Sequence, residues 1–140
     1  IKMGAWSHEP FGNDTACDWK SELEGSTDYE VIEQAFDQMI EDDDEYLDAD
    51  YGSVVHAAAE VLAKVLGQGT QNESYPEGID EWIATLTSKP SAALLQKAVV
   101  ALDLLLSEES ELNELWEESG EDYPLWKENI ATLKEILIAG

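Results

Sequence analysis

The chain has few basic residues and no long apolar run. Its 140 residues include seven Lys and Arg against 32 Asp and Glu, so the formal net charge is −25 at pH 7. A field of this sign repels phosphate backbones and anionic lipid surfaces, so neither nucleic acid nor a membrane is expected as a partner. No apolar run approaches the roughly 20 residues that a membrane span needs. The same charge would attract a basic protein.

Cysteine is nearly absent, because Cys17 is the only one. A single cysteine allows neither an internal disulfide nor a thiolate zinc cluster. The first residues lack the basic-plus-apolar build of a secretion signal. We therefore expect a cytoplasmic protein without a cofactor. Asp18 follows Cys17, and an adjacent carboxylate disfavours the reactive thiolate, so we predict that Cys17 is a buried core residue and not a nucleophile.

The most apolar segment is 53–66, which reads SVVHAAAEVLAKVL. Apolar residues recur around most of its helical circumference, and only His56, Glu60 and Lys64 interrupt them, four residues apart. A helix of this kind is normally enclosed by its neighbours. A second strongly apolar helix is expected at 91–106. These two segments predict the centre of a helical bundle.

The predicted fold class is all-α, a single-domain helical bundle of about six to seven helices around two central apolar helices. The outer helices are expected at 14–23, 28–40, 79–86, 107–119 and 125–138, because each range has the helical period and is bounded by Gly, Pro or capping residues. Gly67 and Gly69 end the first central helix. No run alternates between apolar and polar residues as a strand does. The domain is expected to span 3–140, with Ile1 and Lys2 added ahead of a native start at Met3.

The acidic junction 41–50 is the first candidate for a cation. An EF-hand loop needs oxygen ligands at positions 1, 3 and 5, glycine at position 6 and glutamate at position 12. Counting from Asp48 puts Gly52 at position 5 and Ala59 at position 12, and counting from Asp44 fails as well. We expect a solvated acidic turn, with a weak and unspecific calcium site as the alternative.

His56 and Glu60 lie one helical turn apart, a spacing that can hold a metal ion from one face. A metal site in a bundle also needs partners on other helices, typically a Glu-x-x-His motif, and the sequence has none. We therefore predict no metal site. The favoured interpretation is that Glu60 pairs with His56 and with Lys64 along the same helix. No motif for a catalytic nucleophile or a phosphate loop is present, so no catalytic residue is predicted.

Tryptophan is frequent for a chain of this size. At helical spacing each tryptophan is most simply a core residue; two or three gathered on an acidic surface would instead anchor an interface. The five positions are Trp6, Trp19, Trp82, Trp116 and Trp126.

The opening segment reads MGAWSHEPFGNDTACDW and contains Met3, Gly4, Ala5, Trp6, Pro10, Phe11, Asn13, Asp14 and Trp19. This segment resembles the opening of a family of bacterial proteins known as domain of unknown function 4259, and the similarity begins there. It resumes at HAAAEVLA (56–63) and again at SELNELWEESG (110–120), followed by Trp126, so it spans nearly the whole chain. Ser7 is a departure, because family members often carry glycine there.

The resemblance implies one helical domain in a bacterial cytoplasm and supplies no activity. The residues that match its motifs, together with His56, are our candidates for contacting a ligand or partner: Trp6, Asn13, Asp14, His56, Glu60, Glu111 and Trp116. Asn13 and Asp14 are explained by helix capping and Trp6 by packing. Glu60 is the least easily explained, since it is a carboxylate on an otherwise apolar helix.

Two functions are consistent with these observations. The favoured one is a non-enzymatic module that masks a basic protein surface, as toxin-neutralising or regulatory proteins do, because the charge is −25 and no catalytic motif is present. The alternative is a small-ligand-binding protein or enzyme that uses a pocket around Glu60. Exposure of Glu60, or a simple pair with Lys64, would argue against the alternative.

Overall fold

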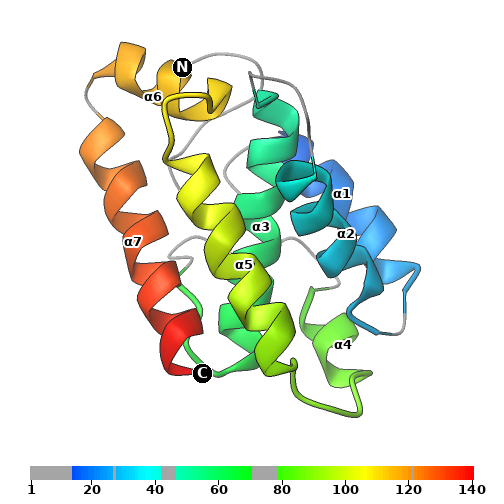
Figure 1. Cartoon of the computed structure of the whole chain (residues 1–140). Coiled ribbons are helices and arrows are strands. Elements are labelled where there is room, and N and C mark those ends of the chain that lie inside the picture. The colour runs from blue at the N-terminus through cyan, green and yellow to red at the C-terminus, as the bar shows by residue number, and fades with distance from the viewer. Residues whose placement is uncertain (1–13, 27, 42–46, 71–78, 121) are drawn as a thin grey trace.

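A computed structural model describes residues 14–26, 28–41, 47–70, 79–120 and 122–140. Within these ranges the chain forms seven helices and no strand (Figure 1). In chain order they are α1 (Asp14–Glu24), α2 (Glu30–Ile40), α3 (Ala49–Val65), α4 (Ile79–Ala84), α5 (Ala92–Leu105), α6 (Glu111–Ser119) and α7 (Tyr123–Ala139). The all-α bundle that the sequence predicts is confirmed.

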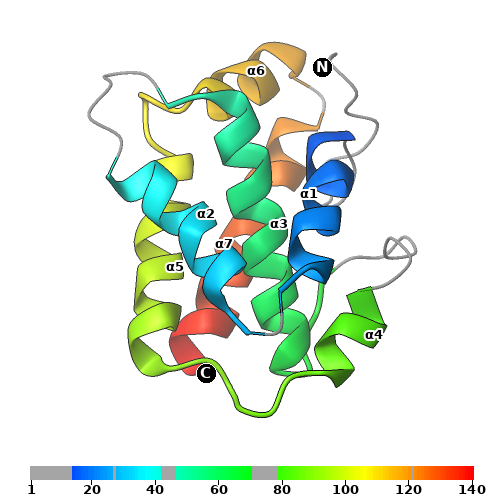
Figure 2. The ribbon, with the colours of Figure 1, turned by 90° about the vertical axis from the view of Figure 1, so that its right-hand side faces the viewer.

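The helix α3 lies at the centre of the fold. It packs against α1, α2, α5, α6 and α7, and Figure 2 shows it between α1 on one side and α2 and α5 on the other. Its residues from Val55 to Ala63 are all buried. The second apolar helix, α5, packs against α2, α3 and α7. The prediction of two central helices is therefore confirmed.

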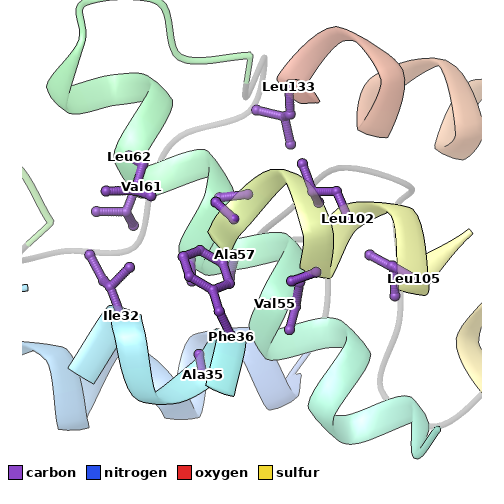
Figure 3. Close-up of a cluster of buried hydrophobic side chains, with 14 of the residues drawn as sticks. Ile32, Ala35, Phe36, Val55, Ala57, Val61, Leu62, Leu102, Leu105 and Leu133 are labelled. Carbon is purple, nitrogen blue, oxygen red and sulfur yellow. The ribbon is translucent and has the colours of Figure 1, made fainter. Parts of the chain in front are cut away.

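One apolar cluster joins these helices. Figure 3 shows Ile32 and Phe36 of α2 facing α3 and α5, and Leu133 of α7 facing Leu102 of α5. The inner residues of α2 recur at three and four positions, which is the spacing that puts side chains on one face of a helix. The four described tryptophans (Trp19, Trp82, Trp116 and Trp126) are all buried, as a core role predicts.

Two helix starts differ from the sequence prediction by four residues, and the others by two or fewer. The helix α3 begins at Ala49, four residues early, because the Asp48 carboxylate accepts a hydrogen bond from the Asp50 N–H at 2.7 Å and caps it. The helix α6 begins at Glu111, four residues late, because Ser110 is its cap. The residues just before the two helices also pair with each other, through an isolated parallel bridge between Leu47 and Ser110 that the sequence pattern does not reveal.

A smaller correction concerns Cys17. It is half-buried, and the prediction of a fully buried core residue is wrong. The inner face of α1 is formed by Ala16, Trp19 and Leu23. Position 17 is rotated about 100° away from position 16 on a helix and so lies at the edge of this face.

Candidate functional site

The structure places the sequence candidates at three different sites. His56 and Glu60 lie on the side of α3 that meets α7, and Trp116 is close to them. Glu111 is at the start of α6. Asp14 is the first residue of α1. Trp6 and Asn13 fall outside the described residues, as do residues 42–46 of the acidic junction 41–50.

A buried polar chain connects His56 to Glu60 through residues of other elements. The Nε2 atom of His56 lies 2.5 Å from Oδ1 of Asn129 in α7. The Nδ2 group of Asn129 donates a hydrogen bond of 2.8 Å to the Thr70 hydroxyl. Thr70 in turn donates twice to the Glu60 carboxylate, from its hydroxyl to Oε1 and from its backbone N–H to Oε2 at 2.8 Å.

The direction of the buried polar chain follows from its chemistry. An amide oxygen only accepts and an amide NH₂ only donates, so the Nε2 atom of His56 must carry the hydrogen. The Thr70 hydroxyl accepts from Asn129 and donates to the carboxylate. Every link therefore runs one way, from the imidazole to Glu60. His56 is 2% exposed and Glu60 0%, so these bonds satisfy groups that water does not reach, which is a requirement for burying them.

The end of α3 brings Thr70 back onto Glu60. Gly67 has a positive φ of 84°, a backbone conformation that glycine adopts without steric cost. Its N–H donates to the Lys64 carbonyl at 2.9 Å, and the Gln68 N–H donates to the Ala63 carbonyl at 2.9 Å. This pair of bonds is the Schellman ending of a helix. The glycine stop predicted from the sequence thus also positions the donor for Glu60.

Aromatic rings enclose the imidazole end of the chain. The Trp126 ring stacks on Trp116 and on Tyr123, with centroids 6.3 and 6.2 Å apart, and the His56 ring meets Trp126 edge-on at 6.4 Å. Trp126 is 1% exposed. Among the described residues its indole N–H has no hydrogen-bond partner. Trp116 is therefore linked to His56 through Trp126.

The contacts described for the three polar residues of α3 lead away from that helix. His56 bonds Asn129, Glu60 bonds Thr70, and Lys64 Nζ lies 3.1 Å from Asp80 Oδ1. The sequence interpretation of pairs along the helix did not include Thr70 or Asn129. A local signal for Asn129 exists, because it follows Trp126 by three positions and so borders the inner face of α7.

A shallow pocket of about 230 Å³ lies at the outer side of the chain, where Thr70 and Asn129 are among its lining residues. Neither His56 nor Glu60 is among the described residues that line it. A molecule in this pocket would meet an amide and a hydroxyl that already bond each other. The arrangement suits a structural tie between α3, α7 and the segment 66–70 better than acid–base chemistry, which needs its titratable groups within reach of a substrate.

Glu111 does not belong to the buried polar chain and bonds the start of α3 instead. Its carboxylate accepts a hydrogen bond of 2.8 Å from the Ala49 N–H, the first backbone donor of α3. The Leu47 N–H donates to the Glu109 carbonyl at 2.7 Å, and the Glu111 N–H to the Leu47 carbonyl at 2.9 Å. An anion at a helix N-terminus also matches the helix dipole. Glu111 therefore joins α6 to the start of α3.

Charge is unevenly distributed over the surface. Segment 98–126 has no Lys or Arg. Apart from Asp103 in α5, its exposed acidic residues lie on and beside α6. Two exposed aspartates at the start of α3 belong to the same group. We call this group the acidic end: Asp48, Asp50, Glu108, Glu109, Glu114, Glu117, Glu118 and Asp122. Elsewhere, Lys20, Lys64, Lys97 and Lys134 each lie within 3.2 Å of a carboxylate.

Two features are absent from the described part of the chain. There, no group of three or more His, Cys, Asp or Glu side chains is arranged to hold a metal ion. No helix in those ranges has the length and apolar character needed to cross a membrane.

The fold and surface thus define an acidic, all-helical domain with two apolar helices at its centre. The family model of a domain of unknown function, DUF4259, matches residues 4–129, and the chain belongs to this family. The family resemblance inferred from the opening, central and α6 motifs is confirmed. A search of curated proteins and one of solved structures gave no match.

Proposed function

We propose that this protein is a non-catalytic binding module that masks a positively charged surface of another protein. The observation that supports the proposal is the position of the exposed carboxylates of the acidic end relative to the lysines. The acidic end has no lysine or arginine in the adjoining segment 98–126, whereas four lysines elsewhere are paired with carboxylates.

An acidic end without a basic side chain in the adjoining segment has a local negative field. Complementary charge steers a basic partner toward that end and raises the association rate, while it repels acidic competitors. Because the attraction acts over about 10 Å at ordinary ionic strength, binding should be salt-sensitive.

The test is capture of partners from host lysate at low salt, with stepwise salt elution and mass spectrometry. Three baits are compared: the natural chain, Glu117→Lys/Glu118→Lys in the acidic end, and Glu81→Lys/Glu135→Lys on α4 and α7. All four glutamates are exposed. Both double variants change the net charge equally, and Lys and Glu have similar helix propensities.

We expect one basic protein to elute from the natural bait at moderate salt. The α6 variant should lose it or release it at a lower salt concentration, because complementary charge has been removed, while the control variant should retain it. An empty column at low salt would contradict the proposal. Equal losses in both variants would also contradict it, since they would show a response to net charge alone.

A further inference from the structure

A groove runs between α1, α2 and the start of α3, three helices that lie next to one another in Figure 2. Its volume is about 430 Å³, and known small-molecule sites occupy roughly 300–1,000 Å³. The polar and aromatic residues that line it are two carboxylates, two aromatic rings, two amides and one hydroxyl: Glu22, Asp50, Trp19, Tyr51, Gln34, Gln38 and Thr15. None of these residues belongs to the buried polar chain.

The groove is negatively charged. Its two carboxylates come from different helices, Glu22 from α1 and Asp50 from α3, and both are exposed. The described lining residues include no Lys, Arg or His. Asp50 Oδ1 accepts a hydrogen bond of 3.3 Å from Thr15, which orients the carboxylate toward α1. A cation entering the groove would therefore meet acceptors from two directions.

The aromatic residues of the groove indicate which kind of cation it would bind. Tyr51 is 43% exposed, an unusual position for a large ring, and it directly follows Asp50 in α3. Trp19 also lines the groove from α1 but is 5% exposed, so the accessible aromatic face is that of Tyr51. A guanidinium group is planar, stacks on aromatic faces and bonds carboxylates through several N–H donors at once, whereas an ammonium group is a compact and strongly hydrated point charge. Rings beside carboxylates therefore favour guanidinium.

The remaining lining is apolar. Val31 and Ala35 of α2 and Val54 of α3 line the groove, and such a surface suits the methylene stem of a long cationic side chain. We propose that the groove binds an alkylguanidinium cation, with its charged group between Glu22 and Asp50 and its stem along Val31, Ala35 and Val54.

An alkylguanidinium group can come from two sources: an arginine side chain of a protein or a free guanidino compound. The first source deepens the proposed function and rests on it, because the arginine would belong to the basic partner. The position of the groove agrees with this source, since Asp50 is also part of the acidic end, and α6 contacts α3. The second source would stand without any partner protein.

The experiment titrates the purified chain with n-butylguanidinium and, separately, with uncharged n-butylurea, following backbone and indole N–H signals by NMR. We expect saturable shifts around Trp19 and Tyr51 with the guanidinium compound and none with the urea at the same concentration. The variant Glu22→Gln/Asp50→Asn should bind at least about fivefold more weakly, on the scale of two lost charge contacts. The matched control Glu81→Gln/Glu135→Gln should change affinity less than about twofold, because neither residue lines the groove.

A second variant, Tyr51→Ala, keeps the inference testable if the double variant does not fold. Because Tyr51 is half exposed its loss should be tolerated, and affinity should fall about threefold with the aromatic face removed. A blocked tripeptide with a central arginine separates the two sources. Saturable binding of the tripeptide supports a protein arginine, and binding of n-butylguanidinium alone supports a free compound.

Equal shifts with n-butylguanidinium and n-butylurea would overturn the inference, and so would equal weakening in the groove and control variants. The assay contains no partner protein, so its result is independent of the capture experiment. A groove that binds guanidinium on a chain that captures nothing would leave the inference standing and contradict the proposed function. A chain that captures a basic partner but binds no n-butylguanidinium would contradict the inference and leave the proposed function standing.

Discussion

The two sides of α3 are buried by different interactions. Toward α2 and α5 the contacts are apolar, between residues such as Phe36, Val55 and Leu102 (Figure 3). Toward α7 the contacts include the buried polar chain through His56 and Asn129. An apolar face gains free energy from many small contacts spread over its area. A polar chain gains little in net terms, and loses heavily when one link leaves the others without a partner.

This difference shows how each side constrains the sequence. The apolar side requires volume and shape, and conservative swaps between apolar residues of similar size are tolerated. The polar side requires particular donors and acceptors at four positions contributed by three separate segments of chain. Substitutions on the two sides should therefore differ in how well a conservative replacement restores stability.

The largest expected effect is on the apolar side, in Phe36→Ala. Phe36 is fully buried, and truncating a buried phenylalanine removes both its transfer free energy and the atoms that fill its space, which costs about 3–5 kcal/mol of unfolding free energy. Urea denaturation followed by circular dichroism measures it. The control Ile138→Ala, at a residue 66% exposed, should stay within about 0.5 kcal/mol. A loss below about 1 kcal/mol in Phe36→Ala would contradict the position of this ring.

On the polar side, Thr70→Val should cost about 1–3 kcal/mol, because it leaves the Asn129 NH₂ without its acceptor and removes one donor to Glu60. Valine keeps the shape of threonine, so the change is chemical and not steric. Thr70→Ser keeps the hydroxyl and should lose less than about 1 kcal/mol. Denaturation in urea compares the two variants. Equal losses would mean that the methyl group matters and the hydroxyl does not.

The apolar side was predictable from the sequence, and the polar side was not. Periodicity identified the apolar faces of α2, α3 and α5, because those faces repeat every three or four residues within one segment. The buried polar chain joins Glu60 to Thr70, and His56 to Asn129, which is 73 residues away. Local spacing carries no information about such a pairing, and it favoured partners four residues apart instead.

The same limit applies to the start of α3. The sequence placed it at Ser53, because the acidic residues before that point break the apolar pattern. In the structure the Asp48 carboxylate caps the helix and the Glu111 carboxylate bonds the Ala49 N–H. The capping preference of aspartate was available in the sequence, but the help from α6 was not. Sequence reasoning therefore found the interior of each helix more reliably than its ends.

The contact between α3 and α6 should be disturbed by Gly52→Ala. An added Cβ would lie 2.9 Å from Leu105 Cδ1 and 3.2 Å from Leu112 Cβ. The first atom is the end of a flexible side chain, but the second is close to the α6 backbone, so relief requires α6 to move. Overpacking costs about 1–3 kcal/mol, and replacing glycine in a helix returns about 1 kcal/mol.

The net loss for Gly52→Ala should therefore be about 0–2 kcal/mol, smaller than for Thr70→Val. Urea denaturation gives the stability, and the indole N–H signal of Trp116 in α6 reports the displacement. Stabilisation by the full propensity gain, with the Trp116 signal unchanged, would show that α6 does not press on this glycine.

The smallest effect on stability should come from Lys97→Gln, because this substitution removes a contact at the surface and not one of the buried contacts of α3. Lys97 Nζ lies 2.8 Å from Asp37 and 3.2 Å from Glu33, joining α5 to α2. Hydrogen bonds to these carboxylates, Asp37 first, raise the pKa of Lys97 above its ordinary value of 10.5. A raised pKa in the folded state means that the contribution is fully present below about pH 10.5 and is lost as the pH rises through the folded-state pKa.

The stability difference between the natural chain and Lys97→Gln should accordingly be constant near neutral pH and shrink above pH 10.5. Burial also raises the pKa of Tyr29, so the folded chain loses stability in the same alkaline range when that ring ionises. Tyr29 is present in both proteins, and its contribution cancels in the difference. Urea denaturation of both proteins across this pH range isolates the lysine. A difference that persists unchanged above the folded-state pKa would mean that Lys97 stabilises α2 and α5 through its methylene stem and not through its charge.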